Sequence, residues 1–409
     1  MTLSRLRWTF APLTLTVLGC SDPSGPGTIN ALPRDLTSAE QKLITGSNGF
    51  AFDLFRQINT DQRSSNVFIS PLSASMALGM TVNGAAGSTY DAMHKTLRLG
   101  DASKQEVNEG YESLIALLRG LDKSTDFRIA NSIWYEQTFP FNDSFLADSK
   151  SFFDAEVKGL DFHNPSSLAT INSWVNQSTA GKIPAILDAI DSTEKMFLIN
   201  AIYFKGTWQT QFDKSKTTDA PFFALDKTTP IVPLMHQVGA TLRIARASNY
   251  EAVDLLYGNS AFTMTIVLPH AGVDINAFAE SLTGDAWKTL EESFTEQKSD
   301  LLLPRFQLMW KRELNPDLTA LGMGIAFSDN ADFTGMSPLG RHLAITHVLQ
   351  KTFVDVNEEG TEAAAATSVG IGPTSAPPSI IVNRPFVFVI RERFSGTILF
   401  MGKIVKLPA

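Results

Sequence analysis

Apolar residues recur at helical spacing in the first half of the chain, which predicts a series of amphipathic helices. The first helix is expected to begin after Thr37, because a threonine hydroxyl can cap free backbone N–H groups. Ser70-Pro71 predicts the start of a second helix, since serine caps a helix and proline suits its first position. A third helix is expected to end before Gly181. The apolar positions of the three helices are Ala39, Leu43, Phe50, Leu54 and Phe55; Leu72, Met76 and Met80; and Leu168, Ile171 and Val175.

The second half of the chain carries strand patterns. Residues 263–268 alternate between two faces before Pro269, and residues 351–357 alternate as well. Residues 385–390 form a continuous apolar run, as expected of a strand buried on both faces. Because helices lead the first half and strands the second, the pattern predicts a mixed α+β fold rather than a regular series of βαβ units.

The composition is that of a folded globular protein. The chain has 409 residues, of which 44% are hydrophobic and 19% charged. This length suggests two or three domains. No linker or charge run divides the chain after residue 45, however, so a single large domain remains an alternative. The 42 acidic and 34 basic residues give a net charge of -8, which argues against nucleic acid as a partner.

The N-terminus has the features of an export signal. Arg5 and Arg7 precede an apolar stretch over residues 8–18 that is too short to span a bilayer but has the length of a signal-peptide core. It ends in Val17-Leu18-Gly19-Cys20, which resembles a bacterial lipobox.

We therefore expect residues 1–19 to be removed and Cys20 to carry a lipid. A flexible tether is expected over residues 20–36, because serine, proline and glycine are frequent at its start. The protein would be exported and lipid-anchored at the cell envelope or surface, or extracellular. An ordinary signal peptide with an incidental cysteine is the alternative. The single cysteine also excludes internal disulfides and cysteine-based zinc clusters.

The chain lacks the sequence motifs of the common enzyme classes. It has no Gly-x-Ser-x-Gly elbow, phosphate-binding loop, His-Glu-x-x-His motif or dinucleotide fingerprint. Among its histidines only His342 and His347 are close, and their spacing suits neither a helical nor a strand metal site. No metal and no cofactor are expected. A hydrolase with a Ser-His-Asp site assembled from distant residues stays open as a third hypothesis.

An unusual segment lies near the C-terminus. Residues 363–382 carry no charge, and loops of this length are usually functional or disordered. Its small residues could enter a β-sheet without burying a charge. Prolines at its far end would resist insertion and keep that part extended. A disordered alanine-rich connector fits this segment equally well. The positions that would share one face of a strand are Thr361, Ala363, Ala365 and Thr367, and the prolines are Pro373, Pro377 and Pro378.

Six groups of residues, in the same order, make the chain resemble a serpin from about residue 37 to its C-terminus. Each group alone is weak, but together they cover more than 300 residues. They are residues 66–73 (NVFISPLS), 200–208 (NAIYFKGTW), 303–306 (LPRF), 321–323 (LGM) with 331–336 (ADFTGM), 358–366 (EEGTEAAAA), and 383–386 (NRPF) with 400–403 (FMGK).

The resemblance implies one α+β domain over residues 37–409. A serpin has three β-sheets, eight or nine helices and an exposed reactive-centre loop, here at about residues 358–380. It implies a monomeric inhibitor of serine proteases that is not itself an enzyme. The protease attacks the loop and forms an acyl-enzyme. The cleaved loop then enters the main sheet, and the protease stays covalently trapped. A non-inhibitory serpin, acting as a binding or structural cell-surface protein, is the alternative.

The resemblance also assigns the reactive loop. The hinge of an inhibitory serpin must have small residues to enter the sheet. This chain has four alanines there, which favours an inhibitor, because non-inhibitory serpins commonly carry bulky, charged or proline residues in the hinge. Counting fifteen residues from Gly360, or eleven back from Pro385 as in an elastase-inhibiting member of the family, places the cleaved bond at Thr374-Ser375. Ser375-Ala376 is the rival bond. The hinge comprises Glu358, Gly360, Thr361, Glu362, Ala363, Ala364, Ala365 and Ala366.

Specificity is expected to follow the residues before this bond. Thr374 is small and uncharged, so it suits an elastase-like or subtilisin-like pocket rather than a trypsin-like one. Pro373 and Ile371 suit elastase-like sites as well. A cysteine protease is a second option for the partner.

Other matched positions imply control of sheet opening. Ser70, Ser73 and Asn200 match the shutter region of the family, and Trp208, Arg305 and Glu358 match the breach, where the loop first enters. We expect an Arg305–Glu358 ion pair that holds the top of the sheet closed. Gln350 stands where the family has a histidine, so this position cannot gain a charge near neutral pH.

Overall fold

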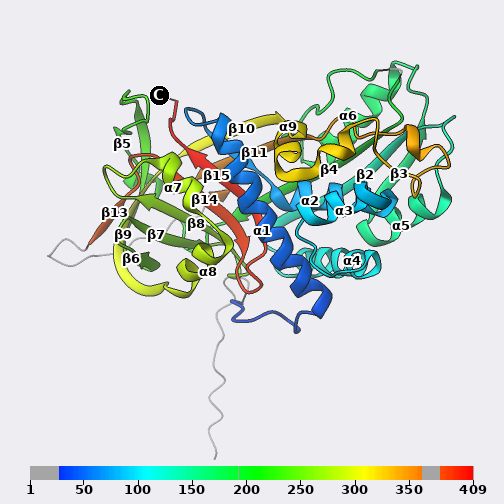
Figure 1. Cartoon of the computed structure of the whole chain (residues 1–409). Helices are drawn as coiled ribbons and strands as arrows, with labels where there is room; N and C mark the ends of the chain where they lie inside the picture. The colour runs from blue at the N-terminus through cyan, green and yellow to red at the C-terminus, as the bar shows by residue number, and fades with distance from the viewer. Residues whose placement is uncertain (1–26, 192, 362–377, 409) are drawn as a thin grey trace, which may run out of the picture.

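A computed structural model describes residues 27–191, 193–361 and 378–408 of the chain. Within these ranges it has nine α-helices and two hydrogen-bonded sheets (Figure 1). The helices are α1 Ser38–Asp61, α2 Pro71–Gly84, α3 Gly87–Thr96, α4 Lys104–Gly120, α5 Asp143–Phe153, α6 Ser166–Ser178, α7 Ile275–Ser281, α8 Gly284–Glu292 and α9 Asn315–Leu318. Short helical turns are η1 Lys214–Lys216, η2 Thr319–Met323, η3 Gly324–Phe327 and η4 Gly340–His342.

The smaller sheet has six strands. In spatial order they are β10 Phe306–Glu313, β11 Leu349–Asn357, β12 Gly360–Thr361, β4 Met196–Thr207, β2 Asp126–Glu136 and β3 Ala155–Leu160. Helices cover both of its faces. Helices α2 and α4 contact β4 and β2 from one side, and α6 packs against the same strands with a separate apolar cluster that includes Trp134, Ile171 and Phe197.

The larger sheet has nine strands. In order they are β1 Val67–Ile69, β15 Ile398–Ile404, β14 Phe386–Glu392, β8 Phe262–Pro269, β7 Tyr250–Leu256, β6 Ile231–Arg246, β9 Thr295–Pro304 and β13 Ser379–Ile381, while β5 Thr218–Pro221 pairs with β6 off this path. The resemblance implied three sheets. In the described residues the second and third are continuous, because β6 bends at a bulge between Gln237 and Ala240 and runs through both.

The mixed α+β fold and the individual elements expected from the sequence are confirmed. Thr37 caps α1: its hydroxyl accepts a hydrogen bond from the Glu40 backbone N–H at 3.1 Å, and its own backbone N–H donates to the Glu40 carboxylate at 2.7 Å. Ser70 caps α2, with Pro71 at its first position. The third helix is α6, and the three strand patterns correspond to β8, β11 and β14.

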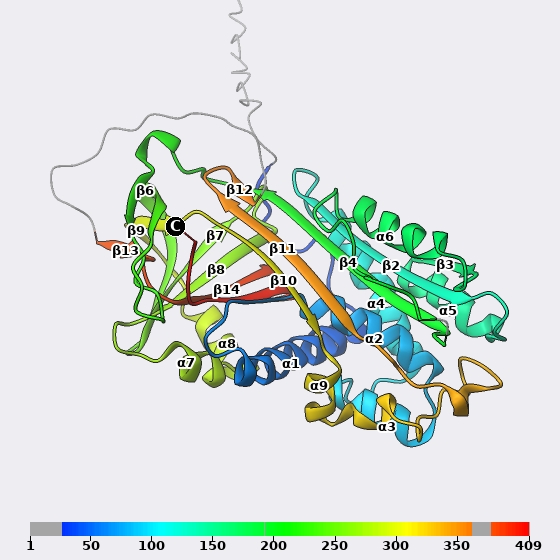
Figure 2. The same ribbon diagram turned by 90° about the horizontal axis from the view of Figure 1, so that it is seen from above.

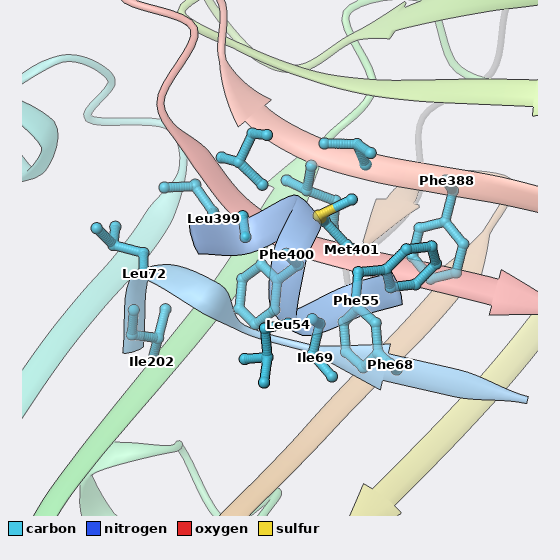
Figure 3. Packing of buried hydrophobic residues seen from close by; sticks show 14 of the residues in the cluster. Leu54, Phe55, Phe68, Ile69, Leu72, Ile202, Phe388, Leu399, Phe400 and Met401 are labelled. Carbon is cyan, nitrogen blue, oxygen red and sulfur yellow. The ribbon is translucent and has the colours of Figure 1, made fainter. Parts of the chain in front are cut away.

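The main core joins the first helix to the C-terminal strands. The Phe68 ring on β1 stacks on Phe388 of β14 at 5.5 Å and on Phe400 of β15 at 5.3 Å (Figure 3). Leu54 and Phe55 of α1 lie against the same cluster, and all of these side chains are buried. Full burial of each large apolar side chain contributes about 2 kcal/mol, so α1 and the last two strands depend on each other.

The end of the predicted tether is bound to the body. The Ile29 N–H donates to the Asn259 carbonyl at 2.9 Å, in the turn between β7 and β8. Arg34 forms a bidentate ion pair with Glu40 at 2.8 and 2.6 Å, and the Glu40 side chain is fully buried. Ile29 and Arg34, near the end of the segment predicted as a flexible tether over residues 20–36, therefore make hydrogen bonds to the folded domain, and the tether itself stays a prediction. Residues 1–26, including Cys20, lie outside the described residues.

Replacing Arg34 with methionine should destabilise the protein. Burial would raise the pKa of the Glu40 carboxyl, but hydrogen bonds from Arg34 and from the Thr37 backbone lower it to about 2. This stability is present above the ordinary value of 4.5 and is lost as the pH falls towards 2. At pH 7 we expect Arg34→Met to lower the unfolding free energy by about 2 kcal/mol, measured by urea denaturation.

A matched control is Arg128→Met, because Arg128 makes a similar bidentate pair with Asp126 on an exposed strand end. We expect a change below about 0.5 kcal/mol there. Equal effects of the two substitutions, or an Arg34→Met effect that persists unchanged at pH 2, would contradict this account.

Candidate functional site

The six-stranded sheet is joined in its middle by only two residues. Gly360 and Thr361 form β12, which pairs with the last residues of β11 on one side and with Gly206 and Thr207 of β4 on the other. Among the described residues no ladder connects β4 directly to β11. Figure 2 shows the two long strands crossing the molecule with β12 at their upper ends. Below β12 the sheet therefore has two facing strand edges that the described strands do not pair.

The hinge is fixed by backbone contacts at this point. The Glu359 carbonyl accepts from the Trp208 N–H at 2.8 Å, and the Glu358 carbonyl accepts from the Phe212 N–H at 2.8 Å. Gly360 must be glycine, because a Cβ at this position would lie 2.1 Å from the Gly206 carbonyl oxygen. The chain thus turns from β11 into the sheet without room for a larger residue.

Two ion pairs surround the turn. Arg305 donates to the Glu358 carboxylate, as the resemblance implied, and the Thr217 hydroxyl donates to the same carboxylate at 2.7 Å. Burial would raise the pKa of Glu358, but the hydrogen bonds from Arg305 and Thr217 hold it below its ordinary value. Lys214 pairs with Glu359 at 2.5 Å. The two hinge carboxylates are thereby held by cations that precede β5 and follow β9.

Trp208 joins the hinge to the larger sheet. Its indole Nε1–H donates to the Asn357 carbonyl at 2.9 Å, and its ring stacks on Tyr257 at 4.4 Å. The Tyr257 hydroxyl shares a hydrogen bond of 2.8 Å with the Thr361 hydroxyl. Burial raises the pKa of Tyr257, so this phenol stays neutral. The first inserted residue, Thr361, is therefore buried and hydrogen-bonded to a fixed partner.

The shutter residues meet beneath the centre of the sheet. Gln350 makes two hydrogen bonds to the backbone of Ser70, accepting from its N–H at 3.1 Å and donating to its carbonyl at 2.7 Å. The Ser70 hydroxyl donates to the Leu399 carbonyl at 2.8 Å, and the Ser73 hydroxyl donates to the Asn200 carbonyl at 3.4 Å. These bonds connect α2 to β11, β4 and β15. The amide of Gln350 thus anchors one edge of the central opening to the helix below it.

Cavities follow the unpaired part of the sheet. A narrow one of about 30 Å³ lies over α2, between Leu198 of β4 and Leu349 of β11. It adjoins a larger one of about 250 Å³ at the lower end, between Met196 and Ile345. His347 lies at the boundary of both cavities. The space between the two strands is therefore open below the shutter.

The structure brings together all the shutter and breach residues expected from the sequence, and it places Glu358, Gly360 and Thr361 at the head of the opening. The other predicted loop residues lie outside the described residues; they are Glu362, Ala363, Ala364, Ala365, Ala366, Ile371, Pro373, Thr374 and Ser375. Sequence reasoning missed Thr217, Lys214 and Tyr257. No local pattern marks them, because each reaches the hinge across more than a hundred residues of chain.

The described residues contain neither a membrane-spanning helix nor a cluster of metal ligands. No helix in these ranges is long and apolar enough to cross a membrane. No group of three or more histidine, cysteine, aspartate or glutamate side chains there could hold a metal ion.

Known proteins match this arrangement over nearly the whole chain. A family profile described as serpin (serine protease inhibitor) matches residues 45–407. The leukocyte elastase inhibitor of Sus scrofa is 36% identical over 379 residues, covering 89% of this chain and 99% of that protein. The chain is a serpin. Serpin B8 of Homo sapiens is 35% identical, with coverage of 88% and 98%.

Solved serpin structures have the same fold. Human thyroxine-binding globulin superimposes with a TM-score of 0.84 at 30% identity, covering 91% of this chain and all of that one. The thermophilic serpin tengpin in its native state gives a TM-score of 0.81 at 29% identity, with coverage of 94% and 98%. This serpin therefore belongs to a family of serine protease inhibitors and has that family's fold.

The Gln350 amide should make the shutter insensitive to pH. Replacing it with histidine puts a group that titrates near pH 6.5 against the Ser70 N–H. A protonated imidazole cannot accept from that N–H, so protonation would be disfavoured in the folded state, and stability would fall as the pH drops through this range. Between pH 7.5 and 5.5 we expect Gln350→His to lose about 1 kcal/mol more than the parent protein, measured by urea denaturation.

The control is Gln350→Leu, which removes both hydrogen bonds and adds no titratable group. It should be destabilised by a similar amount at both pH values. A Gln350→His protein whose difference from the parent is the same at pH 7.5 and 5.5 would show that the shutter does not sense charge at this position.

Proposed function

We propose that this serpin inhibits a serine protease by cleavage of its reactive loop at Thr374-Ser375. The acyl-enzyme formed there would be trapped when the loop enters the six-stranded sheet. The target would be an elastase-like or subtilisin-like enzyme. The observation that carries this proposal is the opening between β4 and β11, with the start of the loop already paired at its head as β12.

The energetics of that opening support insertion. An incoming strand would form ladders with β4 and β11 at once, and its small side chains would bury no charge. Thr361 illustrates the fit, since its side chain is 2% exposed and bonded to Tyr257. The next positions are Glu362 and four alanines. One charged residue therefore enters early, and none follows until after residue 382.

The relatives support the class of target. Three mammalian proteins named leukocyte elastase inhibitor, from pig, cattle and man, are 35 to 36% identical to this chain. An elastase-like specificity agrees with the small, uncharged Thr374 of the predicted bond. We extend the proposal to cysteine proteases only as a second class of partner, since both kinds of enzyme form acyl-enzymes.

We further propose a bacterial lipoprotein that is exported and anchored through Cys20. The support is the sequence of residues 1–20, with a charged start, a short apolar core and a lone cysteine at its end. The chain would then act as a monomer at the cell surface. Labelling with a radioactive fatty acid, compared between the parent chain and Cys20→Ser, tests the anchor separately from inhibition.

A non-inhibitory role is the second candidate. Solved structures similar to this chain include thyroxine-binding globulin with thyroxine, a serpin whose name describes the binding of a small molecule. A binding protein of this kind would have its loop cut by proteases without trapping them. The two candidates therefore differ in the fate of the protease.

The deciding experiment mixes the lipid-free chain with pancreatic elastase and, separately, with subtilisin. We expect an adduct that survives SDS on a denaturing gel and a released fragment that begins at Ser375 by mass. Thr374→Arg should lose the elastase adduct and gain one with trypsin, because an acid-bottomed pocket accepts arginine. Thr374→Val, which keeps the size and loses the hydroxyl, is the matched control and should keep the elastase adduct.

Clean cleavage by every enzyme, with full protease activity left and no adduct, would contradict trapping and favour the non-inhibitory candidate. An adduct whose fragment begins at Ala376 would instead move the reactive bond by one residue.

A further inference from the structure

The lower end of the central opening carries polar side chains that belong neither to the shutter nor to the breach. Strands β4 and β11 both begin at this end, at Met196 and Leu349 (Figure 2). Glu194 lies just before the first strand, and Thr346 and His347 lie just before the second. All three line the cavity of about 250 Å³ between the strands. The segments that lead into the two strands therefore face each other across the opening.

Glu194 is bound by both residues of the opposite segment. The Thr346 hydroxyl donates to one oxygen of its carboxylate at 2.6 Å, and the His347 Nε2 lies 3.5 Å from the other oxygen. The Glu194 side chain is 7% exposed, so its charge needs these partners. We call Glu194, Thr346 and His347 the lower latch.

Each half of the lower latch is held by its own side of the sheet. On the β11 side, the Asn315 amide donates to the Thr346 carbonyl at 2.8 Å and accepts from the Val348 N–H at 2.8 Å. On the β4 side, the Lys195 carbonyl accepts from the last N–H of β2 at 2.9 Å. Because both halves are fixed through the backbone, the two strands cannot part at this end without breaking the lower latch.

The His347 ring lies between two carboxylates. Its Nδ1 is 2.8 Å from Glu313, the last residue of β10, and its Nε2 faces Glu194. Lys195 and His342 are the other titratable groups that line this cavity, and two carboxylates outweigh the one lysine. A neutral imidazole donates from one ring nitrogen and a protonated one from both. Both pairs are therefore complete only when the imidazole is charged, a state that histidine side chains gain between about pH 8 and about pH 5.

The register of the sheet places the lower latch at the end of any insertion. Gly206 pairs with Thr361 at the upper end, and Met196 lies ten residues before Gly206 on β4. A strand that kept this register would bring residue 371 opposite Met196, and two residues later it would reach Glu194. The proposed bond follows residue 374. The loop would therefore meet the lower latch last, after it has passed the breach and the shutter.

We propose that Glu194, Thr346 and His347 form a pH-sensitive latch that controls the completion of loop insertion. Below about pH 6 the charged imidazole would pair with both carboxylates, and the lower end would stay closed for longer. The latch is a property of the intact fold, whereas its effect on trapping rests on the proposed function. Slow insertion gives the acyl-enzyme time to hydrolyse, so a closed latch would convert more inhibitor into cleaved product without trapping the protease.

The lower latch itself is tested by a double-mutant cycle between Glu194→Gln and His347→Gln, read by urea denaturation of the intact chain. We expect the interaction to change the folding equilibrium constant about fivefold at pH 5.5 and less than about twofold at pH 7.5. In the control cycle Glu156→Gln, at an exposed glutamate of the distant strand β3, replaces Glu194→Gln and should show no coupling with His347→Gln. Coupling that is absent, or equal at the two pH values, would overturn the latch.

The effect on trapping is measured as the number of inhibitor molecules consumed for each protease molecule trapped. From pH 7.5 to pH 5.5 we expect this number to rise about twofold or more for the parent chain and to stay nearly constant for His347→Gln, with the same protease. Thr346→Val should lower the number at pH 5.5. Its matched control is Thr228→Val, because the Thr228 hydroxyl donates to Asp226 at 2.5 Å in the turn between β5 and β6, away from the opening.

An equal rise for the parent chain and His347→Gln, or equal effects of Thr346→Val and Thr228→Val, would overturn the control of insertion even where the double-mutant cycle shows the pair. A parent chain that forms no adduct at either pH would contradict the proposed function instead. The double-mutant cycle needs no protease, so the two failures are distinguishable.

Discussion

The structure depends on a sheet whose two central long strands are joined by only two residues. Backbone N–H and C=O groups within a protein need partners, and a sheet normally supplies them along its whole length. Here β12 does so for the upper ends of β4 and β11, through Gly360 and Thr361. The cavities below β12 and the hydrogen bonds around the hinge are all arranged about this incomplete junction. This junction leaves the edges of β4 and β11 below β12 without a paired strand among the described residues, so one more strand could lie between them.

The contacts that restrain the opening are weaker than the gain from filling it. The Arg305–Glu358 and Lys214–Glu359 pairs each join an exposed cation to a buried carboxylate, as Arg34–Glu40 does, and each contributes about 2 kcal/mol. The Gln350–Ser70 bonds contribute about 1 kcal/mol each. A new strand of about ten residues would add about ten backbone hydrogen bonds of similar strength, besides the apolar area that it buries. Under the proposed mechanism, insertion would therefore be favoured overall, and the restraints would act on when it begins.

Sequence reasoning reached the elements and the family but not the contacts between them. Helices α1 and α2 were predictable because Thr37, Ser70 and Pro71 are local cap signals, and β14 because its apolar run is continuous. The start of the hinge, at Gly360 and Thr361, was expected from the resemblance, and the small residues after it stay a prediction. The partners of that hinge were not predictable, since Thr217 and Tyr257 lie far from it in sequence and resemble ordinary polar residues. The contacts of Ile29 and Arg34 were missed because the composition around them resembles a linker.

The central claim is that the sheet gains a strand when the loop is cut. The most direct measurement is the thermal unfolding midpoint of the chain before and after cleavage within residues 367–377, followed by circular dichroism with both fragments still associated. Ten additional ladder bonds should raise the midpoint by about 15 °C or more. A cleaved chain that unfolds at or below the midpoint of the intact chain would show that the opening between β4 and β11 does not accept the loop.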